Sequence, residues 1–251
     1  MARYFINIMY KGSRYAGFQV QQNANTIQAE VQKALHIIFK QPIALTCSSR
    51  TDAGVHAASN FFHFDSENIP APQQLNKSVY NLNAILPSDI VILSIQQVPV
   101  DWHCRFTAIS RTYKYYIYQQ KNPFYADKAY FFPYQLKLAS LQEASALLKN
   151  HTDFTTFSKR NTQVKTFNCD IFSAQWSNEG DLMVFTVEAN RFLRGMVRGL
   201  VGTMLRVGSG KISTNDFNNI ILSKNCTQAD FSVPPQGLFL MDVKFPVLSI
   251  T

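Results

Sequence analysis

The chain has 251 residues, of which 46% are hydrophobic, so it can bury a substantial core and is not a disordered chain. This length allows one large domain or two domains of ordinary size. The formal net charge of +8 fits a polyanionic partner such as a nucleic acid or an anionic membrane surface, or it simply marks a basic soluble protein. No run of about 18 apolar residues is present, so we expect no membrane-spanning helix.

The cysteines and the first residues indicate a cytoplasmic protein. The cysteines are widely separated, and no pair has the short spacing of a zinc knuckle or a redox motif. They are Cys47, Cys104, Cys169 and Cys226. Reduced, structural thiols are therefore expected. The chain begins directly with a strand-like segment and shows no pattern of a secretory leader.

The first half of the chain predicts the order strand, helix, strand, strand, helix, strand. The first helix is expected to begin at Asn25 or Thr26, because a capping residue there precedes apolar residues at helical spacing. The remaining expected ranges are strands at 3–10, 43–47, 60–64 and 90–98 and a second helix at about 73–83. This order is the split, ferredoxin-like pattern.

A polar loop joins the expected strands at 43–47 and 60–64. It contains Arg50 and Asp52 two residues apart, followed by Gly54. Polar loops held on a rigid sheet often carry chemistry. Asp-Ala-Gly is also ordinary turn chemistry, because Asp can hydrogen-bond its own backbone and Gly tolerates positive φ. The pattern alone therefore favours a turn over a catalytic site.

The second half repeats a similar series of elements. A strand is expected at 110–118, with Tyr113 and Tyr115 on one face, although alternating tyrosines also suit any half-exposed strand. The other expected elements are a helix at 141–148, a hairpin of 167–176 with 182–189, a long helix opened by 190–198, a short helix at 216–222 and a last strand into which residues 234–240 lead. In the long helix, Arg191, Arg194 and Arg198 would lie on one side. Such arginines are otherwise usually a solvated face.

Several of these segments, in this order, resemble the tRNA pseudouridine synthase A family. Residues 50–57 match Arg-Thr-Asp-Ala-Gly-Val-His-Ala, with Ser49 where the family has glycine. Residues 111–115 match Arg-x-Tyr-x-Tyr, and residues 192–198 resemble Phe-Leu-x-x-Met-Val-Arg. Residues 233–240 resemble Ala-Pro-x-x-Gly-Leu-x-Leu. The matches extend over most of the chain.

Two further segments resemble the family with substitutions. Residues 10–19 are similar to Tyr-Asp-Gly-Ser-x-Tyr-x-Gly-Trp-Gln, but Lys11 replaces the acid and Phe18 replaces the tryptophan. Residues 102–105 are similar to Phe-His-Ala-Arg, with Trp102 and Cys104 as substitutions. These departures leave open a divergent paralogue with a shifted site preference.

The resemblance implies an α+β fold of two ferredoxin-like, RRM-like halves. These halves would be residues 1–103, which carry the catalytic aspartate, and residues 104–251, which carry the uracil-packing tyrosine and the arginine helix. They would form one extended antiparallel sheet flanked by helices, with the active site in a cleft between them.

The resemblance also implies the roles of individual residues. Asp52 corresponds to the family's nucleophile, and Arg50 to its charged partner, which helps to hold the extruded nucleotide. Tyr113 corresponds to the tyrosine that packs on the target uracil. Arg198 would face and position the aspartate, and Leu238 would line the uracil pocket.

The function implied is conversion of uridine to pseudouridine in the anticodon stem-loop of tRNA, at positions 38–40. A carboxylate suits this reaction because positive charge builds on the ribose when the glycosidic bond breaks. The base must first leave its stack. No cofactor and no metal ion are expected. The expected partners are tRNA and a second copy of the chain in a homodimer, without a membrane.

Two alternatives remain open at this point. One is a catalytically silent RNA-binding module that uses the same basic surface. The other is a metal-dependent nuclease, which the scattered acids disfavour. His56, His63 and His103 lack metal-ligand spacing, so each is expected to be a structural histidine or an RNA contact.

Overall fold

The computed structural model describes residues 1–67, 74–160 and 164–247, which fall into two compact units. One unit contains Met1–Ile109 together with the last strand from Leu240 onward, and the other is Ser110–Phe239. The structure divides the chain at residue 110 and not at the expected 104. The reason is that Cys104 packs in one cluster with Phe5 and Val98 of the first unit. The predicted α+β class is confirmed.

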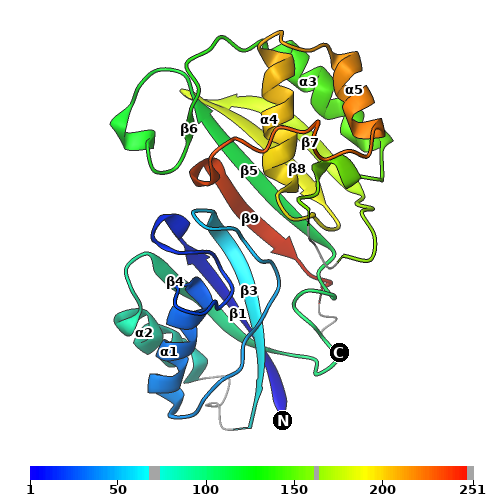
Figure 1. The fold of residues 1–251 in the computed structure, drawn as a ribbon. Coiled ribbons are helices and arrows are strands. Elements are labelled where there is room, and N and C mark those ends of the chain that lie inside the picture. Colours follow the sequence, from blue (N-terminus) through cyan, green and yellow to red (C-terminus); the bar gives the residue numbers. More distant parts are fainter. Residues whose placement is uncertain (68–73, 161–163, 248–251) are drawn as a thin grey trace. The chain divides into compact units, whose positions relative to one another are not determined.

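The first unit has the predicted β-α-β-β-α-β order, with a short 3-10 turn after the first strand. Its elements are β1 (Ala2–Tyr10), η1 (Gly12–Arg14), α1 (Ile27–Phe39), β2 (Thr46–Cys47), β3 (His56–Ser66), α2 (Leu75–Ile85) and β4 (Ile90–Val98). The strands lie in the order β4-β1-β3-β2, and every neighbouring pair is antiparallel. Figure 1 shows α1 and α2 side by side against these strands.

The first helix forms where its sequence predicts. Thr26 is the N-cap, and its side-chain oxygen accepts a hydrogen bond from the Ala29 N–H, which satisfies one of the unpaired donors of the first turn. Ile27, Val31 and Leu35 are buried on one face. The helix ends at Lys40, which adopts a left-handed conformation with φ of 55°.

The strands around the polar loop differ in length from the prediction. β2 contains only Thr46 and Cys47, because the carbonyl groups of Ile43 and Leu45 accept hydrogen bonds from glutamine side chains of α1 and not from β3. β3 already begins at His56, because Ala57 pairs with Tyr10 of β1. Residues 48–55 are therefore a tight connection between two paired strands.

The second unit is built around β5. Its elements are β5 (Ser110–Tyr118), η3 (Pro123–Tyr125), β6 (Tyr130–Phe131), α3 (Leu138–Leu147), η4 (Leu148–Asn150), η5 (Thr155–Phe157), β7 (Ile171–Glu179), β8 (Leu182–Ala189), α4 (Met196–Gly208), α5 (Thr214–Leu222) and η6 (Pro235–Gly237). β8 pairs antiparallel with both β5 and β7, whereas the short β6 pairs parallel with β5. α3, α4 and α5 form one group beside these strands (Figure 1). β9 (Leu238–Lys244) follows η6.

The turn before η5 is fixed by one carboxylate. Asp153 Oδ1 accepts hydrogen bonds from the N–H and the hydroxyl of Thr155, at 3.0 and 2.6 Å. Lys224 Nζ lies 2.9 Å from the other oxygen. Burial alone would raise the pKa of Asp153, but these hydrogen bonds together hold that pKa below its usual range.

The expected arginine stripe on the long helix is wrong. α4 begins at Met196, after Gly195, which has a φ of 76° and so cannot continue a helix. A side chain at Gly195 would also lie 3.0 Å from the Lys159 side chain. Arg191 and Arg194 therefore precede α4, and Arg198 is the one member of the predicted stripe that lies within it.

The helices of the described residues are short relative to a bilayer. None of them is long and apolar enough to cross a membrane.

Candidate active site

The loop that carries Asp52 is tied to β3 at its start. The Ser48 N–H donates to the Phe61 carbonyl at 2.8 Å, which continues the pairing of β2 with β3. The side-chain amide of Asn60, which is fully buried, donates to the Ser49 carbonyl at 3.0 Å. These bonds fix the backbone just before Arg50.

The loop is then tied to β1 through Thr51. Asn60 Nδ2 donates to the Tyr10 hydroxyl at 3.2 Å, and the Tyr10 hydroxyl lies 2.8 Å from Thr51 Oγ1. Since the Tyr10 oxygen accepts from Asn60, its own proton is free to go to Thr51. The Thr51 carbonyl accepts the Phe18 N–H at 3.1 Å. Tyr10 and Thr51 are both buried, so these bonds are protected from water.

A second loop, residues 11–18, presses against the Asp52 turn, and two glycines allow the contact. A Cβ atom on Gly12 would lie only 2.0 Å from the Val55 carbonyl oxygen. The Gly12 N–H donates to His56 Nδ1 at 3.1 Å. Gly17 has a φ of 116°, and a Cβ there would lie 3.3 Å from the Thr51 carbonyl oxygen. The glycines of residues 10–19 thus serve close backbone packing.

The Asp52 side chain differs from the groups around it in that no cation of the described residues pairs with it. Asp52 lies half-buried in a turn closed by a 3.2 Å hydrogen bond from the Val55 N–H to the Asp52 carbonyl oxygen, with Gly54 at a φ of 80°. Arg50 is exposed. Within residues 1–67, 74–160 and 164–247, the Asp52 carboxylate forms no ion pair with Arg50 or any other cation. A rigid turn thus presents a carboxylate whose oxygens are available to a ligand.

The second unit holds Tyr113 on its central strand. Tyr113 pairs with Val187 of β8, and its side chain is 9% exposed. The Phe192 ring meets the Tyr113 ring edge-on, with centroids 5.0 Å apart and an interplanar angle of 80°. Because Phe192 lies in the segment just before α4, this segment sets the orientation of the tyrosine ring.

Arg198 organises the segment that leads to Leu238. From the first turns of α4, its Nε donates to the Val233 carbonyl at 2.8 Å, and Nη2 lies 3.4 Å from the Phe231 carbonyl oxygen. Gly199 allows close approach, since a Cβ there would lie 2.7 Å from the Phe231 ring. Two carbonyl groups of one segment are thereby held by one guanidinium group.

Tyr115 completes the anchoring of this segment. Its hydroxyl donates to the Pro234 carbonyl at 2.7 Å. Burial raises the pKa of Tyr115, so the hydroxyl keeps its proton, although the Arg198 charge opposes this shift. A Cβ on Gly237 would lie 2.8 Å from the Tyr115 ring, which brings the chain directly against β5. Leu238, at 7% exposure, follows immediately.

The five predicted site residues thus form two groups. Arg50 and Asp52 belong to the first unit, and Tyr113, Arg198 and Leu238 belong to the second. The predicted role of Arg198 toward Asp52 stays a prediction. Sequence reasoning missed Asn60 and Thr51 as anchors of the turn, because a buried Asn in a strand and a Thr inside a motif carry no separate signal.

Comparison with known proteins gives the family. A sequence profile described as tRNA pseudouridine synthase matches residues 6–107 and 144–246. The tRNA pseudouridine synthase A of Parabacteroides distasonis is 43% identical over 249 residues, which is 98% of this chain and 97% of the relative. That of Azobacteroides pseudotrichonymphae is 43% identical over 246 residues, with 98% of each chain covered. The chain belongs to the tRNA pseudouridine synthase family, and it is an isomerase.

Proposed function

We propose that this chain converts uridine to pseudouridine in tRNA, at positions 38–40 of the anticodon stem-loop, with Asp52 as the nucleophile. The observation that carries the proposal is the Asp52 turn. It is anchored from β1 and β3, while its carboxylate forms no ion pair within the described ranges of the chain. The full-length similarity to relatives named tRNA pseudouridine synthase A supports tRNA as the substrate.

The reaction explains why a free carboxylate is useful. The bond between ribose C1′ and uracil N1 breaks, the ring rejoins through C5, and the C5 proton is released while N1 gains one. Positive charge develops on the ribose as the first bond breaks, and a carboxylate stabilises or traps it. In the described ranges of the chain no cation occupies the Asp52 carboxylate, so its oxygens can approach the ribose directly.

The second unit supplies the surroundings of the uracil in this proposal. The base is flipped from its stack, which requires a pocket with a flat face and an apolar wall. Tyr113, oriented by Phe192, provides the face, and Leu238 provides the wall. Arg198 positions Leu238 through the Val233 carbonyl and acts on Asp52 when the uridine is bound.

The charge of the chain fits the proposed substrate. A net charge of +8 favours binding of a polyanion, and in this proposal the exposed Arg50 contacts a phosphate of the extruded nucleotide. The reaction is redox-neutral and is proposed to proceed without a cofactor. Action as a homodimer in the cytoplasm is part of the same proposal.

Tritium release from tRNA labelled at uracil C5 tests the proposal. Purified protein is incubated with the tRNA without added metal, and Asp52→Asn is compared with wild type and with Asp181→Asn. Asp181 lies exposed between β7 and β8, so its variant is the matched control. Asp52→Asn is expected to lose more than about 10³-fold in rate while keeping its affinity for tRNA. Asp181→Asn should retain the wild-type rate.

The possible outcomes separate the parts of the proposal. Equal release by wild type and Asp52→Asn would exclude Asp52 as the nucleophile. Tight binding with no release by either would favour a silent RNA-binding protein. Release that persists in tRNA with cytidine at positions 38, 39 and 40 would exclude those positions as the target.

A further inference from the structure

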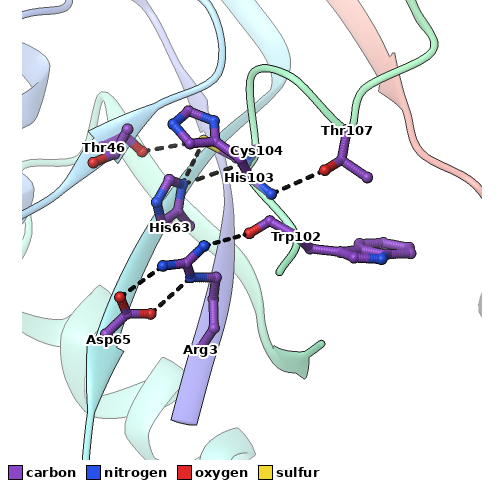
Figure 2. Close-up of polar contacts among 8 residues, drawn as sticks. All are labelled: Arg3, Thr46, His63, Asp65, Trp102, His103, Cys104 and Thr107. Carbon is purple, nitrogen blue, oxygen red and sulfur yellow. Dashed lines mark hydrogen bonds and ion pairs between the residues drawn. The ribbon is translucent and has the colours of Figure 1, made fainter. Parts of the chain in front are cut away.

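A second group of reactive side chains lies in the first unit and includes none of the residues assigned to catalysis. His63 of β3 and the consecutive residues His103 and Cys104 offer three ligand atoms that all lie within 4.8 Å of one another. Figure 2 shows His63 and His103 converging on the Cys104 side chain. His63 lies 41 residues before Cys104 in the sequence, which is why spacing alone gave no indication of a metal site.

The geometry of this group is fixed by the sheet. His63 pairs with Thr46 of β2 and with Phe5 of β1. Cys104 Sγ lies 3.1 Å from His63 Nδ1 and 3.2 Å from the Thr46 carbonyl oxygen. The His63 and His103 rings meet edge-on with centroids 4.5 Å apart. Cys104 is fully buried, His63 is 6% exposed and His103 is half-buried.

We propose that His63, His103 and Cys104 bind a zinc ion. Imidazole nitrogen and thiolate sulfur are the ligands that zinc prefers, and three protein ligands leave a fourth tetrahedral position for water. His103 is the most exposed of the three residues, so water would enter from its side. Carboxylates are not part of the group, which disfavours magnesium and calcium.

The surrounding hydrogen bonds place the ligands in advance. The His103 N–H donates to Thr107 Oγ1 at 2.9 Å, and the Thr107 N–H donates to the His103 carbonyl at 2.9 Å. These two bonds, of which Figure 2 shows the first, close the loop that presents His103 and Cys104. Such outer contacts orient metal ligands and reduce the ordering needed when the ion binds.

Arg3, whose charge acts on both His63 and His103, does not oppose the ion with a full charge. Arg3 donates to both oxygens of Asp65, at 2.7 and 2.8 Å, so its charge is compensated. Its third contact, 2.8 Å from Nη1 to the Trp102 carbonyl, holds the loop to β1. The Arg3–Asp65 pair thus fixes the cluster without cancelling the attraction for a divalent ion.

Binding has a defined chemical cost. The Cys104 thiol must lose its proton, so one proton is released to solvent for each ion bound, and affinity falls as the pH is lowered. The ion also replaces three contacts: the Cys104 thiol to the Thr46 carbonyl at 3.2 Å, the Cys104 N–H to His63 Nδ1 at 3.3 Å, and the Arg105 N–H to His103 Nδ1 at 3.1 Å. The free energy of zinc binding by imidazole and thiolate ligands is larger than the loss of these contacts.

The ion would link two segments of the first unit, and its fourth position stays open to water or another small ligand. The ion would join β3 to the loop after β4, next to the cluster of Phe5, Val98 and Cys104. Residues 102–105 resemble the motif Phe-His-Ala-Arg, and Cys104 stands at its alanine position. A chain with alanine there would lack the sulfur ligand. The uridine chemistry proposed for Asp52 does not require the ion, so the two proposals stand or fall separately.

The test measures zinc binding directly. Protein stripped of metal with a chelator is titrated with zinc against a chromophoric competitor, and cobalt is used in parallel for the sulfur-to-cobalt charge-transfer band. The variants are Cys104→Ala and His103→Gln, with Cys226→Ala and His36→Gln as matched controls on other surfaces. Circular dichroism confirms that each variant is folded.

We expect one zinc ion per chain, a charge-transfer band with cobalt and a higher melting temperature with zinc. His103→Gln should bind at least about 10-fold more weakly, and Cys104→Ala should lose the band and at least about 100-fold in affinity, while both controls bind as wild type. Absence of the band in wild type would overturn the proposal, whether or not Cys104→Ala folds. Binding retained in a folded Cys104→Ala, or lost in Cys226→Ala, would also overturn it.

Discussion

The hydrogen bond between Tyr10 and Thr51 holds the Asp52 turn to β1, and a double-mutant cycle measures how strongly. The two hydroxyl oxygens lie 2.8 Å apart between residues that are 5% and 8% exposed. Tyr10→Phe removes one partner of this bond, Thr51→Val removes the other, and both changes nearly preserve volume. The cycle therefore isolates the bond from changes in packing.

The expected free energies follow from the contacts that each variant loses. Tyr10→Phe also removes the 3.2 Å contact from Asn60 Nδ2, although Asn60 keeps the Ser49 carbonyl as an acceptor. It leaves the buried Thr51 hydroxyl without this partner, so we expect a loss of about 1–3 kcal/mol in the free energy of unfolding. Thr51→Val should cost about 1 kcal/mol. Because both variants break the same bond, the double variant should cost about 1 kcal/mol less than the sum.

Urea unfolding of the four proteins gives the coupling energy. The control cycle combines Tyr10→Phe with Thr214→Val, whose hydroxyl contacts Glu143 in the second unit. That pair should be additive within about 0.5 kcal/mol. Additivity of Tyr10→Phe with Thr51→Val to the same limit would refute the bond as an anchor. In the tritium assay, we expect Tyr10→Phe to lower kcat more than it changes KM, because the turn moves while the RNA contacts remain.

Three other predictions test the packing and the titrating groups. Gly12→Ala should lower the free energy of unfolding by about 1–3 kcal/mol and reduce tritium release, because the new Cβ would lie 2.0 Å from the Val55 carbonyl oxygen. An unchanged melting temperature would contradict this prediction. The pKa of Asp153 is below its usual range in the folded protein. The ionised carboxylate therefore stabilises the fold at pH values above the pKa of Asp153 in the unfolded chain, and this contribution is lost as the pH falls through the pKa of Asp153 in the folded protein. Asp153→Asn should therefore cost about 0.5–1.5 kcal/mol at pH 7, and urea midpoints should show this difference shrinking below about pH 4. Iodoacetamide should modify Cys226 but not Cys169, whose pKa burial raises to about 12, and mass spectrometry of the native protein checks this.

Elements whose bounds depend on their own residues can be predicted from the sequence. The strands Ile90–Val98 and Ser110–Tyr118 have the predicted bounds, because alternating burial and β-branched or aromatic residues act within one strand. Thr26 was predicted as one of two caps, because a capping hydroxyl followed by an apolar helical repeat is a local signal.

Boundaries that depend on distant partners were not predictable. β3 extends back to His56 because of its register with β1, and no feature of residues 56–59 announces that pairing. α4 begins after Gly195, whose backbone conformation suits its contact with Lys159 from a loop more than 30 residues earlier. The conformation of Gly195, and not the helical spacing of the arginines, determines where α4 begins.

In the candidate site, too, some residues are predictable from local sequence and others depend on distant partners. The motif identifies Asp52, but the bonds that fix its turn come from Tyr10, Phe18 and Asn60, on three different segments. Arg198 was expected to act toward the aspartate, and the structure adds the Val233 carbonyl as a partner that no sequence pattern indicates. Similarity therefore predicts which residue reacts, and the fold shows which residues hold its turn in place.

The groups that anchor the Asp52 turn are all uncharged, so salt should affect RNA binding much more than it affects the position of the carboxylate. They are hydroxyl, side-chain amide, imidazole and backbone groups, and none of them is an ion pair. Such bonds are little affected by ionic strength, whereas binding of a tRNA by a chain with a net charge of +8 weakens steeply as salt rises. The position of the carboxylate is thus independent of the electrostatics that capture the RNA. Salt should therefore act on KM and leave kcat nearly constant if Asp52 carries the chemistry.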